Sequence, residues 1–223
     1  MPRSSKKADA AKHPGVKPTL VLLVRHGQTP TTGSSLPGRA PGLHLADTGR
    51  AQAEAAAARI ASLKSVAAVY ASPLERTRET AAPIAKARGL KVQVARGLLE
   101  CDFGDWTGSL LKDLFKLPEW STVQRYPSGF RFPNGESFTE MQQRITGTIA
   151  TLVAKHPGET VVAVSHADPI KAAIAHAMGT HLDLFQRIVV SPCSVTAVAY
   201  GAGGPAVLTV NHTTGTLADL KVS

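Results

Sequence analysis

Long apolar runs and cysteines are both scarce in this sequence, and each scarcity excludes a class of protein. A membrane-spanning helix needs roughly 18 consecutive apolar residues, whereas the purest strand-like run, residues 20–24, has five. The two cysteines, Cys101 and Cys193, are too few for a disulfide scaffold and form no C-x-x-C pair. We therefore expect no membrane association, and we expect a reducing, cytoplasmic location.

The motifs of several common chemistries are also missing. The sequence has no G-x-x-x-x-G-K-[ST] phosphate loop and no G-x-S-x-G nucleophile turn. Neither cysteine is followed six residues later by an arginine, which excludes the loop of a cysteine-dependent phosphatase. The eight histidines form no H-E-x-x-H pair, so we expect no bound metal and no other cofactor.

Acidic residues are few, with 16 Asp and Glu against 25 Lys and Arg, for a net charge of +9. Residues 1–18 hold five of the basic side chains and one acidic one, and are polar and aperiodic. We interpret 1–18 as a disordered basic tail, with a weak phosphate-binding arm as the alternative. The milder excess in the rest of the chain suits an enzyme for anionic metabolites as well as nucleic acid, and no nucleic-acid partner is expected.

Residues 19–223 predict one domain, because 43% of the chain is hydrophobic and 18% charged. Short apolar runs alternate with helical segments, and the end of the chain is rich in strands. We expect strands at 20–24, 66–70, 91–94, 160–164, 187–190, 195–200 and 206–210, and helices at 47–63, 72–88, 136–154 and 168–178. Asp47 or Thr48 and Ser72 are the expected N-caps. This order predicts a three-layer α/β/α domain with a mixed, mostly parallel central sheet.

Side chains suited to binding one anion follow three of the expected strands. Arg25 and His26 follow the first, Arg76 lies in the helix after the second, and His166 follows the strand at 160–164. In open α/β sheets, ligands bind outside the carboxyl ends of the strands. Two guanidinium groups, two imidazoles and the N-terminus of the helix at 168 therefore predict a site for a phosphate dianion. Taken singly, each histidine is better explained as a structural core residue, and it is their occurrence together at strand ends that favours the functional interpretation.

Short motifs spread over residues 20–200 complete this pattern. They are Arg25-His26-Gly27, Ser72-Pro73-Leu74-Glu75-Arg76 with Thr80-Ala81, Leu98-Leu99-Glu100 before Phe103-Gly104-Asp105-Trp106, Gly135-Glu136-Ser137, and Ser165-His166. In this order they resemble the histidine phosphatase superfamily, in its phosphoglycerate mutase-like branch. The set is specific, whereas the Arg-His-Gly tripeptide alone is a weak signal.

The resemblance implies a role for each of five residues. His26 is implied as the nucleophile that forms a phosphohistidine, and Arg25, Arg76 and His166 as ligands of the phosphoryl oxygens. Glu100 is implied as the proton donor to the leaving alkoxide and as the base for the hydrolytic water. The alternatives for this last role are Asp102, Asp105, or a Glu100 that is only a solvated loop charge.

The rim of the site is less well defined. Gln28, Thr29, Arg39 and Ala167 are expected to face the substrate, and solvent exposure in loops is the alternative for the first three. Thr31-Thr32, Thr107 and Ala167-Asp168 depart from the family pattern, which bears on the substrate more than on the reaction. The aromatic residues near 115–132 are read either as a lid over the phosphate or as a satellite core; they are Phe115, Trp120, Tyr126, Phe130 and Phe132, beside Arg125 and Arg131.

The resemblance thus implies a metal-independent hydrolase acting on a small phosphorylated metabolite. A phosphoglycerate-type phosphomutase shares the same site residues and is the first alternative. A non-catalytic phosphate-binding module is the second, and the presence of His26, Glu100 and His166 together weighs against it. The sequence does not indicate the substrate or the oligomeric state.

Overall fold

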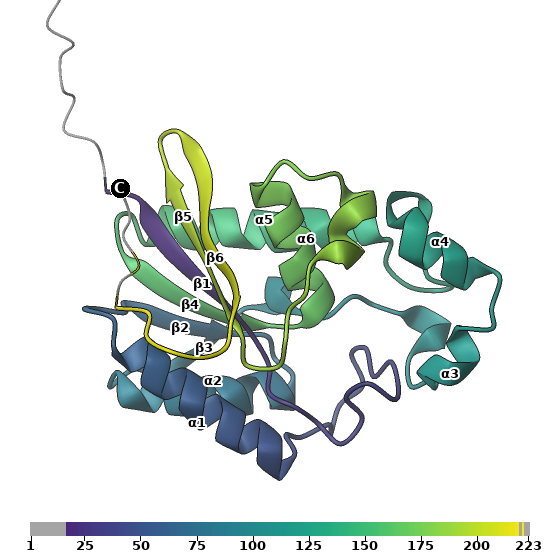
Figure 1. The fold of residues 1–223 in the computed structure, drawn as a ribbon, viewed down its shortest axis with the longest axis horizontal. Coiled ribbons are helices and arrows are strands. Elements are labelled where there is room, and N and C mark those ends of the chain that lie inside the picture. The colour runs from purple at the N-terminus through teal and green to yellow at the C-terminus, as the bar shows by residue number, and fades with distance from the viewer. Residues whose placement is uncertain (1–16, 219, 221–223) are drawn as a thin grey trace, which may run out of the picture.

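A six-stranded mixed sheet forms the centre of the molecule (Figure 1). The structure is a computed structural model and describes residues 17–218 and 220. The strands are β1 (Thr19–Arg25), β2 (Ala68–Ala71), β3 (Val92–Val94), β4 (Thr160–Ser165), β5 (Val195–Gly201) and β6 (Gly204–His212). Their spatial order is β3-β2-β4-β1-β5-β6, with the first four parallel and the last two antiparallel to their neighbours. The predicted mixed, mostly parallel sheet is confirmed.

Helices cover both faces of the sheet, because successive side chains of each strand point to opposite sides. In β1, Leu20 and Leu22 pack into the core beneath one helical layer, whereas Val21 and Leu23 pack into the other. The first layer contains α1 (Asp47–Ala61) and α2 (Glu75–Ala87), and the second α5 (Phe138–Lys155) and α6 (Ala167–Ala177). The three-layer prediction is confirmed.

A smaller helical region lies beyond the end of the sheet (Figure 1). It includes α3 (Leu111–Leu114) and α4 (Glu119–Arg125), with short 3-10 turns before and after them. The turns before α3 are η1 (Arg96–Leu98) and η2 (Gly104–Trp106), and the turn after α4 is η3 (Pro127–Gly129). One more turn, η4 (Leu182–Arg187), follows α6. Aromatic rings fill this region, and several of them join the main core under α5.

Three details of the expected elements are wrong. Residues 187–190 are not a strand, because β5 already occupies the sheet position beside β1 and this segment lies at the wall of a cavity instead. The N-cap of α1 is Ala46, with no side-chain hydrogen bond, rather than Asp47 or Thr48. The N-cap of α2 is Leu74 rather than Ser72, whose hydroxyl instead contacts His166, a residue far away in the sequence.

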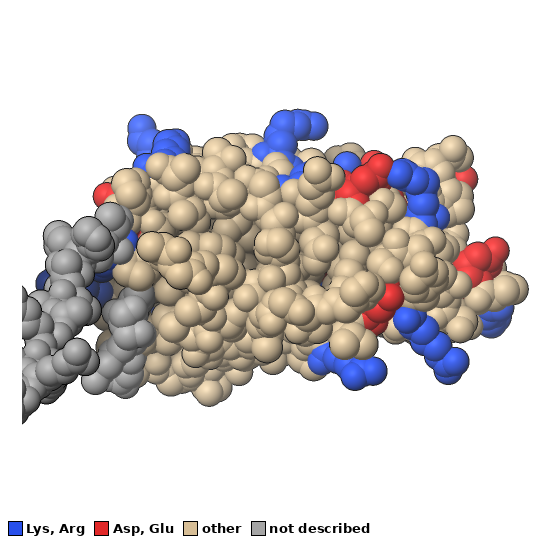
Figure 2. Space-filling view, turned by 90° about the horizontal axis from the view of Figure 1, so that it is seen from above, with Lys and Arg blue, Asp and Glu red and all other residues tan. Residues whose placement is uncertain are grey.

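The expected tail at 1–18 lies outside the described residues except for its last two positions. Figure 2 shows one face of the molecule, seen from the side of the β5–β6 hairpin and the α5–α6 region. Its centre is uncharged, and Lys, Arg, Asp and Glu side chains are found along its borders. Within the part of the chain that the structure covers, none of the helices has the length and apolar character needed to cross a bilayer.

Candidate functional site

The neighbouring strands β2, β4 and β1 end at the same edge of the sheet, and a predicted site residue comes directly after β1 and after β4. Arg25, the last residue of β1, is in register with Ser165, the last residue of β4. His26 and His166 are the next residues along these strands, and their ring centroids are 5.2 Å apart. The predicted convergence at the carboxyl edge of the sheet therefore brings both imidazoles into one place.

The hydrogen bond of His26 determines which of its nitrogens is free. Nδ1 lies 2.8 Å from the carbonyl oxygen of Gly27, a group that only accepts. Nδ1 must therefore carry the proton, which leaves the lone pair on Nε2. Gly27 is required at this turn, because a Cβ there would lie 2.5 Å from the Gly49 carbonyl oxygen. The local backbone thus presents a neutral imidazole whose free lone pair is on Nε2.

The surroundings of His26 disfavour its charged form. The ring is buried, and burial, followed by the positive charges of Arg76 and Arg25, lowers the pKa of His26 to about 3. A nitrogen that is unprotonated at neutral pH is available to attack an electrophile. The same causes, burial first, lower the pKa of His166 well below its usual value.

The buried Arg76 and the half-buried Arg25 each keep hydrogen-bond donors that the described part of the protein does not use. Arg76 is fully buried and gives Nη2 to the Gly38 carbonyl oxygen at 2.7 Å. Arg25 gives Nη1 to the Val190 carbonyl oxygen at 2.7 Å. Among the described residues, Arg76 Nε and Nη1, Arg25 Nε and His166 Nδ1 are buried without a partner. Unpartnered buried polar groups are costly, so this cluster of donors fits an anion with several oxygens, such as a phosphoryl group.

A chain of buried hydroxyl groups holds the other nitrogen of His166. Its Nε2 lies 2.8 Å from the Ser72 hydroxyl, and that hydroxyl lies 2.8 Å from the Thr77 hydroxyl. A neutral imidazole has one N–H. When Ser72 donates to Nε2, that single proton lies on Nδ1, the nitrogen that faces Glu100 at 4.0 Å. His166 then acts as a donor toward the same anion.

Glu100 is a buried carboxyl group that lies beside His166 and lines the same cavity as His26. One oxygen, Oε1, accepts from the Cys101 backbone N–H at 3.0 Å, and the other, Oε2, lies 4.0 Å from His166 Nδ1. Burial first, and then the negative charge of Asp168, raise the pKa of Glu100 to about 7, against the opposing effects of Arg76 and Arg25. Such a group can both give and take a proton near neutral pH.

The sequence of the chain matches the family model of the histidine phosphatase superfamily (branch 1) over residues 21–213. The chain belongs to this superfamily. A protein of Mycobacterium tuberculosis described as bifunctional protein Rv2228c is 34% identical over 200 residues, which is 88% of this chain and 54% of that protein. The chain thus spans about half the length of the first curated relatives it matches.

Other similar proteins match over more of their length. Phosphoserine phosphatase 1 of Hydrogenobacter thermophilus is 31% identical over 178 residues, covering 74% of this chain and 79% of that protein. The mycobacterial glucosyl-3-phosphoglycerate phosphatase Rv2419c superposes with a TM-score of 0.79 at 25% identity, covering 88% and 100% of the two chains. YhfR of Bacillus stearothermophilus superposes with a TM-score of 0.82 at 26% identity, covering 88% of this chain and 98% of that chain.

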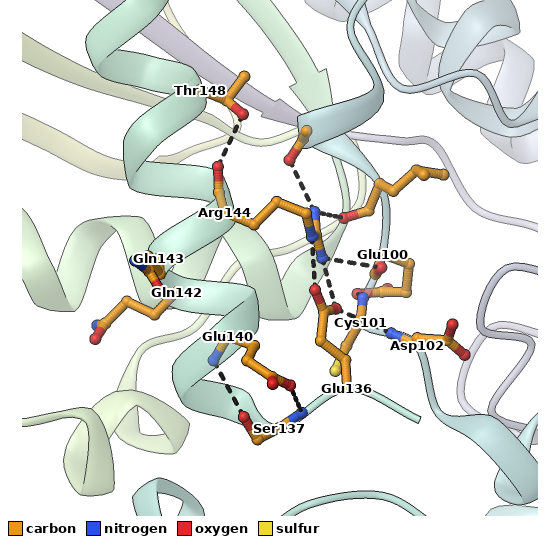
Figure 3. A network of polar contacts seen from close by, with 12 residues as sticks. Glu100, Cys101, Asp102, Glu136, Ser137, Glu140, Gln142, Gln143, Arg144 and Thr148 are labelled. Carbon is orange, nitrogen blue, oxygen red and sulfur yellow. Dashed lines mark hydrogen bonds and ion pairs between the residues drawn. The ribbon is translucent and has the colours of Figure 1, made fainter. Parts of the chain in front are cut away.

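In this member of the superfamily, Arg144 fixes the segment that carries Glu100 (Figure 3). Its guanidinium donates to the carbonyl oxygens of Gly97, Leu99 and Glu100 at 2.8 to 3.2 Å. Both oxygens of Glu136 accept from it at 2.8 Å. The Gly135-Glu136-Ser137 motif therefore acts on the site indirectly, through Arg144, which holds the backbone from Gly97 to Glu100.

The expected rim residues of the site divide into two groups. Thr29 and Ala167 line a 420 Å³ cavity, the catalytic cavity, together with Arg25, His26 and Glu100. Gln28 is not in that wall, and its side chain accepts from Thr48 on α1 at 3.3 Å. Arg39 is also outside the wall. It donates to the Glu100 carbonyl oxygen at 2.8 Å and pairs with Asp102 and Glu136.

Some residues of the site were missed by reasoning from the sequence. Ser72 was expected only as an N-cap, although it contacts His166. Asp168 and Lys171 line the catalytic cavity and pair with each other at 3.6 Å. Their spacing of three on the helix that opens at the site was a signal that could have identified this pair. The contact between Val190 and Arg25 had no local signal.

Proposed function

We propose that this protein is a metal-independent phosphomonoester hydrolase that works through a phosphohistidine on His26. The observation that carries the proposal is the cluster of unpartnered buried donors on Arg25, Arg76 and His166, beside the free Nε2 of His26. The donors suit the three non-bridging oxygens of a phosphoryl group, and their charge suits the negative charge gathered there in the transition state.

The reaction proceeds in two steps that leave the enzyme unchanged. In the first, His26 Nε2 forms a bond to phosphorus as the bond from phosphorus to the ester oxygen breaks, and protonated Glu100 gives its proton to that oxygen. In the second, Glu100 takes a proton from water, the water oxygen bonds to phosphorus, and the bond from nitrogen to phosphorus breaks. Inorganic phosphate leaves, and Glu100 is again protonated.

A phosphomutase is the alternative, because it would use the same residues and return the phosphoryl group to a second substrate oxygen. A bisphosphorylated intermediate needs free cations beyond those that bind the first phosphate. Among the described residues that line the catalytic cavity, the cations are Arg25 and Lys171, and Lys171 is already paired with Asp168. This pairing favours hydrolysis over transfer.

The experiment uses the purified protein with a panel of phosphomonoesters, including phosphoserine and 3-phosphoglycerate, in EDTA and water enriched in ¹⁸O. We expect release of inorganic phosphate that carries one ¹⁸O atom, because water attacks phosphorus in the second step. A mutase would instead isomerise 3-phosphoglycerate without incorporating ¹⁸O. Activity that appears only when a divalent metal is added would contradict the proposal.

The role of Ser72 gives a separate prediction. Ser72→Ala removes the donor to His166 Nε2, so the ring can move its proton to that nitrogen, and we expect kcat/KM to fall by about tenfold. Ser194→Ala is the matched control, since Ser194 is equally buried and its hydroxyl has no partner within the described part of the chain. ¹⁵N NMR of the His166 ring should show the proton on Nδ1 in the parent and control. The same ring tautomer in Ser72→Ala would contradict this role.

A further inference from the structure

The catalytic cavity continues into a second cavity that the phosphate chemistry does not require. The second cavity has a volume of 290 Å³, and we call it the aromatic cavity. The residues lining both are Leu36, Phe103, Leu111, Asp168, Lys171 and Gln186. The residues lining the aromatic cavity alone are Phe115, Trp120, Val123, Gln124, Phe132 and Phe138. A substrate held by its phosphoryl group at His26 therefore has an adjoining space for the rest of the molecule.

The walls of the aromatic cavity are mainly apolar. Five of its residues carry aromatic rings, and Phe115 and Trp120 pack with their ring centroids 5.0 Å apart. Phe115 is 57% exposed at this cavity, so its ring is accessible to a bound molecule. Val189, in the wall of the catalytic cavity, is 65% exposed. Ligand sites commonly combine such apolar walls with a few fixed polar groups.

The charged groups at the junction of the two cavities neutralise each other. Lys171 Nζ lies 3.6 Å from the Asp168 carboxylate, donates to Gln186 at 3.1 Å, and stands over the Phe185 ring. The Lys171 and Asp168 side chains are only 18% and 19% exposed. A carboxylate or second phosphate on the substrate would have to displace Asp168 from this pair. The junction therefore favours an uncharged group.

We propose that the substrate is a phosphomonoester of an uncharged, apolar alcohol, aryl or extended alkyl, whose apolar part lies in the aromatic cavity. This inference rests on the proposed hydrolase function and adds the class of the leaving group. It distinguishes this chain from an enzyme for phosphorylated hydroxy acids or amino acids, whose substrates carry a carboxylate near the phosphate.

The test compares esters whose alcohols have closely similar basicity. Ethyl phosphate, n-hexyl phosphate and 5-carboxypentyl phosphate differ in apolar length or in a remote carboxylate, so the chemical step is nearly the same for all three. We expect kcat/KM to be at least about tenfold higher for hexyl than for ethyl phosphate, and the terminal carboxylate to remove that gain. Phosphoserine and 3-phosphoglycerate should be poorer substrates than hexyl phosphate.

Two variants test the position of the apolar group. Phe115→Asp places a charge at the aromatic cavity and should reduce the hexyl-to-ethyl ratio to near one. Met178→Asp is the matched control, because Met178 is similarly exposed at 58% and lines neither cavity. Asp168→Asn frees Lys171 and should raise the carboxypentyl-to-hexyl ratio several-fold. A ratio cancels any effect of Asp168 on Glu100, because both esters use the same proton donor.

The outcomes separate this inference from the proposed function. Hydrolysis of 4-nitrophenyl phosphate with equal kcat/KM for ethyl and hexyl phosphate would overturn the apolar substrate class and leave the hydrolase standing. A preference for 3-phosphoglycerate or phosphoserine over hexyl phosphate would do the same. Failure to hydrolyse any ester, 4-nitrophenyl phosphate included, would overturn both.

Discussion

His26→Ala is expected to lower kcat for phosphomonoester hydrolysis by on the order of 10⁴-fold or more, the largest effect of any single substitution in the chain. The variant lacks the atom that accepts the phosphoryl group, and among the described residues that line the catalytic cavity His26 is the only histidine. The nearest imidazole, His166, has its Nε2 held by Ser72 and its Nδ1 directed to the Glu100 side. Binding of inorganic phosphate should survive, because Arg25, Arg76 and His166 are unchanged.

The measurement combines turnover with trapping of the intermediate. Parent enzyme mixed with a ³²P-labelled ester and quenched in alkali should retain label that is released by acid, as expected of a phosphoramidate bond. His176→Ala is the control, because it removes a histidine from α6 outside the catalytic cavity and should keep both activity and label. Label that persists in His26→Ala would show that another residue is the nucleophile.

The central elements of the fold were predictable because their signals are local. The apolar run at 20–24 is bounded by Pro18 and by Arg25-His26-Gly27, and β1 occupies residues 19–25. The strand at 160–164 ends before Ser165-His166 in the same way, and β4 ends at Ser165. Parallel strands place such ends at one edge, so the approach of Arg25, His26 and His166 followed from the order of the chain.

The features that could not be predicted from the sequence depend on contacts between residues that are far apart in the sequence. Residues 187–190 have the composition of a strand, but β5 holds the available edge of β1. Ser72 stands just before a helix, as an N-cap would, yet its hydroxyl is directed to His166 across the site. Arg39 could not be assigned to structure or substrate from its loop, because Asp102 and Glu136 reach it from two other segments. The protonated nitrogen of His26 follows from one backbone carbonyl whose direction no pattern reveals.

Glu100→Gln is expected to slow the first turnover of an alkyl phosphate by about 10²- to 10⁴-fold, because an amide cannot give a proton to the departing alkoxide. The first turnover of 4-nitrophenyl phosphate should change little, since its leaving group is stable without a proton. Asp105→Asn is the control, because Asp105 accepts instead from the Asn134 side chain at 3.0 Å. Equal losses for both esters in Glu100→Gln would assign the proton donor to another group.

The pH profile tests the same assignment through a different observable. His26 must be neutral, and burial among Arg76 and Arg25 lowers its pKa to about 3, so its titration limits activity only in strong acid. Glu100 must be protonated, and burial raises its pKa to about 7, so kcat/KM for an alkyl phosphate should fall as the pH rises through about 7. Asp168→Asn removes the negative charge that helps to raise this pKa, so the descending limb should move to lower pH. In Glu100→Gln the descending limb should disappear, because residue 100 no longer has a proton to lose. A descending limb that persists unchanged would mean that a different acid protonates the departing alcohol.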